Sequence, residues 1–358
     1  MNYIVIIDEP NYLGGIRYIE RFFKILENIE RASNYKIITI NFRLNDSFLS
    51  KNNEVIYINK YLYKLDKIIV RIFKLSFFSN FICNKNPNSI FWFSNIFITD
   101  RLKKSQNIKV VNWIPDFQFL DFPHYFSFLN KISRYFYLRL QIKFSDIIIL
   151  QSEIDKNRLI KMHSKYKEKY FLWQFYEPIK ISNQNSVTNN IPKKYFIYPH
   201  QMWRHKRHDL LLEFFSKNIE YNLVLTGQLI DVRDKAYTEK IKKILKQAPK
   251  NIFPLGKVSS NELENLMKNA TAILNLSEYE GWSSCVEEAI SFNIPLILNT
   301  LPINIEQIPE AYYVDIKKNN WEYDLLDIIK NLSKVNYDHS TRYNRSVKQL
   351  NAILNHLD

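Results

Sequence analysis

Short apolar runs alternate with amphipathic segments along most of this chain. The first half contains YIVII (3–7), YKIITIN (35–41) and FSDIIILQS (144–152), and the second contains YFIYP (195–199), YNLVLTG (221–227), TAILNLS (271–277) and PLILNT (295–300). Between them lie segments with apolar residues at helical spacing, such as 16–29 and 236–247. Strands that alternate with helices of this length predict a parallel sheet covered on both faces, so the fold class is α/β.

A polar stretch without periodicity, EPIKISNQNSVTNNIPKK (177–194), divides this pattern into two halves. It contains two prolines and several Asn and Ser residues, which is typical of a linker. The length of 358 residues also favours two domains. We therefore predict two Rossmann-like, doubly wound domains, residues 1–180 and 190–338, and a terminal helix at 339–358. Ligands of such sheets bind at the carboxyl ends of the strands.

Composition narrows the class of protein. Cys83 and Cys285 show no pairing pattern, which fits a reducing compartment and predicts a cytoplasmic protein. The opening MNYIVIIDEP lacks the basic start of a signal peptide, and no apolar run reaches the roughly 18 residues of a membrane-spanning helix.

The positive charge is unevenly distributed. Residues 1–180 hold 28 Lys and Arg against 16 Asp and Glu, whereas the remainder hold 22 against 20. The first half therefore faces an anionic lipid surface, nucleic acid or phosphorylated substrate, or else it has an ordinary solvated basic surface.

Several kinds of site have no support in the sequence. Neither the GxGxxG fingerprint of nicotinamide enzymes nor the GxxxxGK[ST] loop of P-loop proteins occurs. His200, His205 and His208 lie close together, but their spacing does not match a zinc site. No recognition helix or RNA-binding motif accompanies the basic charge and the 15% aromatic content. We expect no metal, no cofactor and no nucleic-acid partner.

The segment SEYEGWSSCVEEAI (277–290) carries four glutamates at the end of a predicted buried strand. Glu278 is interpreted as a solvated residue, and Glu287 as the partner of Ser284 in a capping box that starts the next helix. The free amides of this helix start are suited to an anion. Glu280 would lie in the loop and Glu288 in the first helical turn, so both carboxylates are expected to reach one ligand.

Glu280 and Glu288 are separated by seven residues, and this spacing resembles the motif of the family-4 retaining glycosyltransferases of GT-B fold. Further segments are similar to that family in the same order, and the resemblance covers almost the whole chain: YLGGIRYI (12–19), NWIPDFQFLDFPHYFS (112–127), PHQMWRHKRHDLLLEFF (199–215), TGQLIDVRDKAYTEKIKKIL (226–245) and LGKVSSNELENLMKNA (255–270). The resemblance implies transfer of a sugar from a nucleotide-sugar to an acceptor hydroxyl, with retained configuration and no bound metal. It also implies that the terminal helix packs back on the first domain.

The resemblance assigns roles to particular residues. Glu288 would hold the two ribose hydroxyls, because a carboxylate accepts two hydrogen bonds at once. Glu280 would touch the donor sugar near the reacting carbon, and Lys206 would neutralise the leaving diphosphate, with help from Arg204 or Arg207. The remaining donor-binding residues would be Gly281, Trp282, Ser283, Ser284, Gln201, Gly227, Lys257, Gly14 and Gly15.

The chain also departs from the family pattern. Gln201 stands where many members have an arginine, and Ser283 replaces a frequent glycine. The histidine that many relatives carry near the sugar is replaced by Pro115, so Asp116 becomes the candidate acceptor-side base, with a turn-forming role as the alternative. These departures leave open a GT-B relative that binds sugar-nucleotides without catalysis.

The expected acceptor is a glycan or a polyprenyl-diphosphate-linked glycan of a bacterial surface polysaccharide. Residues 51–85 mix lysines with Tyr, Phe and Ile, as a surface in contact with anionic lipid does. They are therefore expected to make peripheral contact with the inner face of the cell membrane. The alternative is an ordinary amphipathic helix that faces the core.

Overall fold

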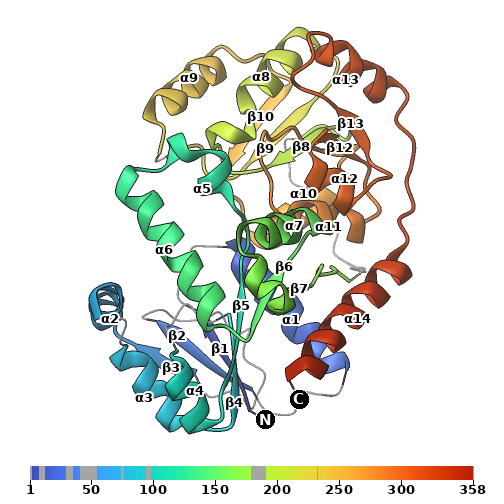
Figure 1. Cartoon of the computed structure of the whole chain (residues 1–358). Coiled ribbons are helices and arrows are strands. Elements are labelled where there is room, and N and C mark those ends of the chain that lie inside the picture. Colours follow the sequence, from blue (N-terminus) through green and yellow to red (C-terminus); the bar gives the residue numbers. More distant parts are fainter. Residues whose placement is uncertain are drawn as a thin grey trace. The chain divides into compact units, whose positions relative to one another are not determined.

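The chain forms two compact units (Figure 1). Unit 1 consists of Met1–Tyr176 and Tyr343–Asp358, and unit 2 consists of Glu177–Arg342. The computed structural model describes residues 2–7, 13–29, 35–40, 55–73, 76–93, 98–178, 191–231 and 233–357. Most of the predicted linker, residues 179–190, lies outside the described residues.

Unit 1 is built on a parallel sheet with the strand order β3-β2-β1-β4-β5-β6-β7. Its strands are β1 Asn2–Ile7, β2 Tyr35–Ile40, β3 Val55–Ile58, β4 Ser89–Trp92, β5 Lys109–Trp113, β6 Ile147–Leu150 and β7 Tyr170–Leu172. Its helices are α1 Leu13–Asn28, α2 Lys60–Phe73, α3 Phe77–Lys85, α4 Asp100–Gln106, α5 Gln118–Asp121, α6 Phe128–Phe144, α7 Glu153–Met162 and most of α14 His339–Leu357, with 3-10 turns η2 Pro123–Tyr125 and η3 Ser164–Lys169.

Unit 2 has a parallel sheet with the order β10-β9-β8-β11-β12-β13. Its strands are β8 Phe196–Pro199, β9 Leu223–Thr226, β10 Ile252–Gly256, β11 Ala272–Asn275, β12 Leu296–Asn299 and β13 Tyr312–Val314. Its helices are α8 His208–Lys217, α9 Lys235–Lys246, α10 Ser260–Lys268, α11 Ser284–Ser291, α12 Pro302–Gln307 and α13 Trp321–Lys330, with the 3-10 turn η4 Arg204–Lys206. The predicted α/β class with two parallel sheets is therefore confirmed.

The central strands are apolar except at the carboxyl ends of β9, β11 and β12, because both faces of each sheet are covered. Every residue of β6, β9, β11 and β12 is buried, as expected for parallel strands between helical layers. The strands β3, β7 and β13 went unpredicted, and β7 and β13 have only three residues, too few to show a periodicity.

Much of the aromatic content of unit 1 lies in its core. Tyr18 of α1 stacks on Trp113 of β5, with ring centroids 3.9 Å apart, and Phe22 packs against Trp92 of β4. Trp173 contacts both Tyr18 and Phe22. These rings fix α1 over the sheet, so their abundance reflects packing.

The terminal helix α14 passes from unit 2 into unit 1 at Arg342 and Tyr343. Within unit 1, Gln349 accepts a hydrogen bond of 2.7 Å from the Gln174 amide, and the rings of Tyr343 and Tyr176 are 5.8 Å apart. Leu350, Ile353 and Leu354 are buried. None of the described helices is both long and apolar enough to cross a bilayer.

Candidate functional site

The predicted donor residues of unit 2 follow the carboxyl ends of neighbouring parallel strands. Residues 200–206 follow β8, Gly227 follows β9, and residues 276–283 join β11 to α11. Because β9, β8 and β11 are adjacent in the sheet, these three loops meet at one edge. This is the edge at which doubly wound sheets bind their ligands.

Lys206 and Glu280 are in direct contact at this edge. The Lys206 Nζ atom lies 2.5 Å from Glu280 Oε1, and the two side chains are only 10% and 9% exposed. Burial pushes the pKa of Glu280 upward, but the charge and the hydrogen bond of the Lys206 ammonium lead the effects that outweigh it, so the pKa lies below its usual value. The site therefore holds a fixed cation and an ionised carboxylate, each desolvated and each neutralising the other.

The backbone around Lys206 is held by the strands beneath it. The Tyr198 hydroxyl donates a hydrogen bond to the Lys206 carbonyl, and the Glu278 amide donates to the His205 carbonyl at 2.8 Å. The rings of His200 and His208 pack edge-on against Tyr198, with centroids 4.7 Å and 4.8 Å away. Lys206 consequently sits on a buried aromatic support.

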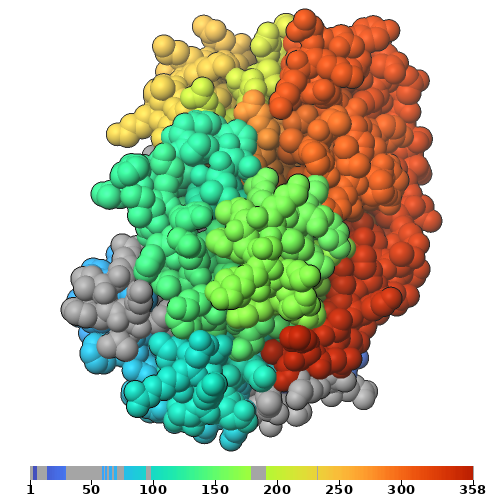
Figure 2. All heavy atoms as spheres, viewed as in Figure 1, coloured from blue at the N-terminus to red at the C-terminus, as the bar shows by residue number. Residues whose placement is uncertain are grey.

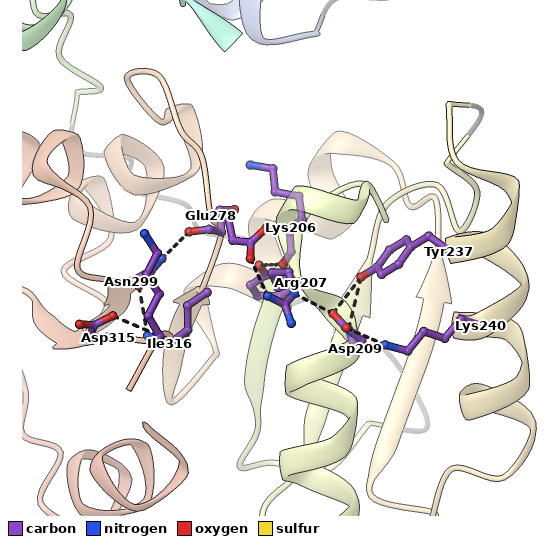
Figure 3. A network of polar contacts seen from close by, with 12 residues as sticks. Lys206, Arg207, Asp209, Tyr237, Lys240, Glu278, Asn299, Asp315 and Ile316 are labelled. Atoms are coloured by element: carbon purple, nitrogen blue, oxygen red, sulfur yellow. Dashed lines mark hydrogen bonds and ion pairs between the residues drawn. The ribbon is translucent and has the colours of Figure 1, made fainter. Parts of the chain in front are cut away.

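The neighbouring cations are engaged with other carboxylates (Figure 3). Arg207 lies 2.6 Å from Glu278 and 3.1 Å from Asp209, and Lys240 completes the row at 2.8 Å from Asp209. Arg204 is exposed and pairs with Asp234 at 3.0 Å. The prediction that Glu278 is merely solvated is wrong, because it anchors Arg207. Lys206 is the cation that contacts Glu280.

The predicted capping box is also wrong. The helix α11 starts at Ser284, its N-cap is Ser283, and no side chain caps it. Glu287 is fully buried and accepts hydrogen bonds from Trp282 Nε1 at 3.0 Å and from Arg342 at 2.5 Å. The carboxylate turns inward because a buried arginine offers a stronger partner than a helix-end amide does.

The remaining motif residues surround this helix start. Glu288 is 6% exposed and is the fifth residue of α11, so it lies at the beginning of the second turn rather than in the first. Gly281 and Ser284 are half-buried. Ser283 donates its amide to Gln307 Oε1 at 3.0 Å. The Ser283 amide is thus used inside the protein, and the predicted donor contact of Ser283 stays a prediction.

Gly227 has a structural reason to be glycine. Its φ is +105°, and a Cβ atom would lie 2.5 Å from the His200 carbonyl oxygen. This close approach brings the loop after β9 against the peptide between His200 and the half-buried Gln201. Lys257 follows β10 and is exposed.

The first-domain candidates lie at the carboxyl edge of the sheet of unit 1. Gly14 and Gly15 are in the first turn of α1, and Asp116 follows β5. Asp116 accepts a hydrogen bond from the Gln118 amide at 2.9 Å, as expected for its alternative, turn-forming role.

A further carboxylate of unit 1, Asp155, lies near Asp116. Burial, with the nearby Asp116 and Asp121 carboxylates, raises the pKa of Asp155 to about 6.

The three clustered histidines are buried and neutral. Burial, reinforced by the Lys206 charge, lowers the pKa of His200 far below its usual value and that of His205 to about 3. Burial is also the main reason that the pKa of His208 is lowered to about 3. Among the residues that the structure describes, no group of three or more His, Cys, Asp or Glu side chains could hold a metal ion.

Sequence reasoning missed several residues that shape the site. Asn275 and Ser277 are buried at the end of β11, where the Asn275 side chain accepts the Ser277 amide, and Gln307 and Arg342 meet Glu287 from 20 and 55 residues away. The first two stand at the start of the motif segment or just before it, and could have been suspected as polar residues at the end of a buried strand. The other two carry no local signal, because only the fold brings them to the motif.

Comparisons with known proteins agree with this geometry. Residues 180–345 match the family described as glycosyl transferases group 1. No curated protein sequence matches the chain. Sucrose-phosphate synthase from Thermosynechococcus elongatus superposes with a TM-score of 0.73 at 14% identity, over 100% of this chain and 99% of that one.

Two further solved structures share the fold. Anabaena HepE, in complex with UDP and glucose, has a TM-score of 0.67 at 12% identity and covers 99% of this chain and 94% of its own. The UDP-GlcNAc 2-epimerase of Methanocaldococcus jannaschii has a TM-score of 0.57 at 18% identity, over 99% and 100% of the two chains. The chain therefore has the GT-B fold, and its segment 180–345 is similar to the glycosyl transferases group 1 family.

Proposed function

We propose that this protein is a retaining, metal-independent glycosyltransferase that moves a sugar from a nucleotide-sugar to a hydroxyl of a glycan or polyprenyl-diphosphate-linked acceptor. The observation that carries the proposal is the desolvated contact between Lys206 and Glu280, together with the buried Glu288 eight residues further along the chain. A cation, a sugar-facing carboxylate and a ribose-binding carboxylate are the groups that such a donor requires. The family match and the UDP complex of HepE support a nucleotide-sugar as ligand.

The reaction breaks the bond between the anomeric carbon and the diphosphate oxygen, and forms a bond from that carbon to the acceptor oxygen. Negative charge grows on the diphosphate as it leaves, and Lys206 is placed to stabilise that charge. As the Lys206 ammonium is attracted to the diphosphate, it neutralises Glu280 less. Glu280 then faces the positive charge that develops on the sugar ring. The acceptor proton passes to a base, for which Asp116 remains the candidate.

The setting that we propose is synthesis of a bacterial surface polysaccharide on the cytoplasmic side of the membrane. One screen tests the function: thermal shift with a panel of nucleotide-sugars, followed by transfer assays with polyprenyl-diphosphate-linked glycans. Binding of a donor without nucleotide release in the presence of any acceptor would favour the non-catalytic alternative. Absence of donor binding would contradict both.

The two motif glutamates are expected to differ when each is replaced by alanine. Glu288→Ala removes up to two charge-assisted hydrogen bonds to the ribose, roughly 3 kcal/mol together, or about 100-fold in affinity. It should weaken the intact donor and the free nucleoside diphosphate alike, because both carry the ribose. Glu280→Ala should lower turnover of the donor while the free nucleotide binds nearly as before.

Calorimetric titration with the nucleoside diphosphate, beside steady-state rates, separates these outcomes. Glu213→Ala is the control, because Glu213 is an exposed glutamate of unit 2 that pairs with Lys217 on the surface of α8. Equal nucleotide affinity for Glu288→Ala and the wild type would rule out the ribose assignment. Full turnover by Glu280→Ala would leave that residue without a role in transfer.

The membrane contact is also part of the proposal, and the surface of unit 1 supports it. Along α2 the side chains of Tyr61, Leu62, Leu65 and Ile68 are each more than half exposed, and Lys64 is exposed among them. On α3, Phe77 and Phe81 are also exposed, and the Lys85 ammonium lies over the Phe81 ring. Exposed apolar side chains beside lysines suit an anionic lipid surface better than a helix that faces the core.

A second exposed apolar surface lies on α6, which Figure 2 shows at the surface of unit 1 in blue-green to green. Phe128, Leu129 and Ile132 project into solvent from its first turns, and Arg134 and Arg139 are exposed along the same helix. The mixture of aromatic, aliphatic and basic residues repeats that of α2 and α3. Both surfaces belong to the half of the chain that carries most of the positive charge.

We expect the protein to sediment with vesicles that contain phosphatidylglycerol, and to do so less as salt rises. The double variant Leu62→Ser/Leu65→Ser should reduce the bound fraction about tenfold, because two partly inserted leucines are lost. Tyr323→Ser, at an even more exposed residue on α13 of unit 2, is the control and should bind as wild type. Equal recovery with neutral and anionic vesicles would contradict the electrostatic contribution.

A further inference from the structure

A buried polar network lies directly behind the donor loop of unit 2. At its centre is Glu287, which is 0% exposed and receives hydrogen bonds from three elements. Its Oε1 atom accepts from Trp282 Nε1 at 3.0 Å, from Gln307 Nε2 at 3.0 Å and from Arg342 at 2.5 Å. A buried carboxylate with an arginine partner costs desolvation energy that apolar residues would avoid, so its presence calls for a reason beyond packing.

Gln307 connects this carboxylate to the loop backbone. Its Oε1 atom accepts the Ser283 amide at 3.0 Å, and its Nε2 atom donates to the Ser283 carbonyl at 3.0 Å. One side-chain amide therefore pairs with both backbone groups of a single residue, as a neighbouring strand would. Arg342 in turn donates to the Gln307 carbonyl at 2.9 Å, so Gln307 is itself held at its backbone.

This network holds Trp282 and Ser283, the two residues between Gly281 and α11. Trp282 is held by its indole and Ser283 by its backbone, immediately before the half-buried Ser284 that begins the helix. The loop has no side-chain cap of its own. Its conformation therefore depends on partners that come from α12 and from the start of α14.

We propose that Gln307, anchored by Glu287 and Arg342, is a positioning residue that fixes the Trp282–Ser283 segment so that Gly281 and Ser284 meet the donor diphosphate. This inference rests on the proposed function of the same loop. A misplacement of about 1 Å in such a segment can cost on the order of 100-fold in rate or affinity.

The expected signature follows from the population of the competent loop. If the loop without Gln307 is in position about one-tenth of the time, the apparent dissociation constant of the nucleotide rises about tenfold. Saturating donor selects the competent loop, so kcat should change by less than about threefold while KM rises with the dissociation constant. A purely structural role would lower the melting temperature and leave nucleotide affinity unchanged.

The test compares Gln307→Leu with Asn251→Leu. Asn251 is a buried amide of unit 2 just before β10, and it donates two hydrogen bonds to the backbone carbonyls of Phe215 and Tyr221, so its loss is chemically matched. Amide hydrogen exchange on the unliganded protein should accelerate at Ser283 in Gln307→Leu alone. Titration with UDP, GDP and ADP should show the tenfold loss in Gln307→Leu alone.

Arg342→Lys is a second, milder variant that tests the same network if Gln307→Leu fails to fold. It keeps a positive charge beside Glu287 but replaces the fork that bonds both Glu287 and Gln307, so an intermediate loss of affinity is expected. Unchanged exchange at Ser283 in Gln307→Leu, or a dissociation constant within twofold of wild type, would overturn the positioning role. If exchange accelerates but the wild type binds no nucleotide, the proposed function fails, and the donor-positioning part of this inference fails with it.

Discussion

Replacing Lys206 by alanine is expected to lower kcat about 100- to 1000-fold, while the donor KM changes by about tenfold or less. The reason is that charge builds on the diphosphate only as the sugar leaves, so a fixed cation acts mainly on the transition state. Steady-state rates of nucleotide release over a range of donor concentrations measure the two effects separately. An unchanged kcat with a raised KM would mean that Lys206 only binds the ground state.

The same substitution should also destabilise unit 2, because it leaves the buried Glu280 carboxylate without its ammonium partner. Loss of one member of such a pair costs about 3–5 kcal/mol. The double variant Lys206→Ala/Glu280→Gln should recover most of this stability and none of the turnover, which separates folding from catalysis. Lys240→Ala is the control, because Lys240 is an exposed lysine of unit 2 that pairs with Asp209 rather than with Glu280.

Acid is expected to unfold unit 2 well before its carboxylates titrate. His200, His205 and His208 are neutral in the folded protein, with pKa values pushed below the usual 6.5 by burial. Below that pH the unfolded chain binds protons that the folded unit does not, so the free energy of unfolding falls as pH falls. At pH 5, His205 and His208, with pKa values of about 3, each contribute a loss of about 2 kcal/mol, and His200 acts in the same direction.

Urea unfolding of the protein between pH 8 and pH 5 measures this slope. His208→Asn should reduce the slope by about the share of one histidine, whereas His124→Asn, at an exposed residue of unit 1, should leave it unchanged. Unit 1 must be resolved separately, because the raised pKa of Asp155 acts there in the opposite direction, adding stability as pH falls through about 6. A flat stability of unit 2 from pH 8 to pH 5 would show that the histidines are not held neutral.

Most of the fold could be predicted from the sequence because a parallel sheet covered by helices produces a simple pattern of apolar and polar residues. Strands buried on both faces are almost entirely apolar, as in β6, and the helices between them must be amphipathic. Glu280, Glu288 and Lys206 could be found for a related reason. They follow predicted strands at the edge where such sheets bind ligands, and the spacing of the two glutamates resembles a known family motif.

The sequence by itself determined the alternation of strands and helices, the two parallel sheets and the strand ends from which a ligand would be bound. Only the tertiary structure decided what the polar residues at those ends do. Glu287 reads locally as a helix cap, yet it is buried against Arg342, 55 residues further along. Glu278 reads as solvated, yet it holds Arg207. The physical reason is that hydrophobic periodicity is a local property, whereas the partner of a buried charge is whichever group the fold brings within a few ångströms.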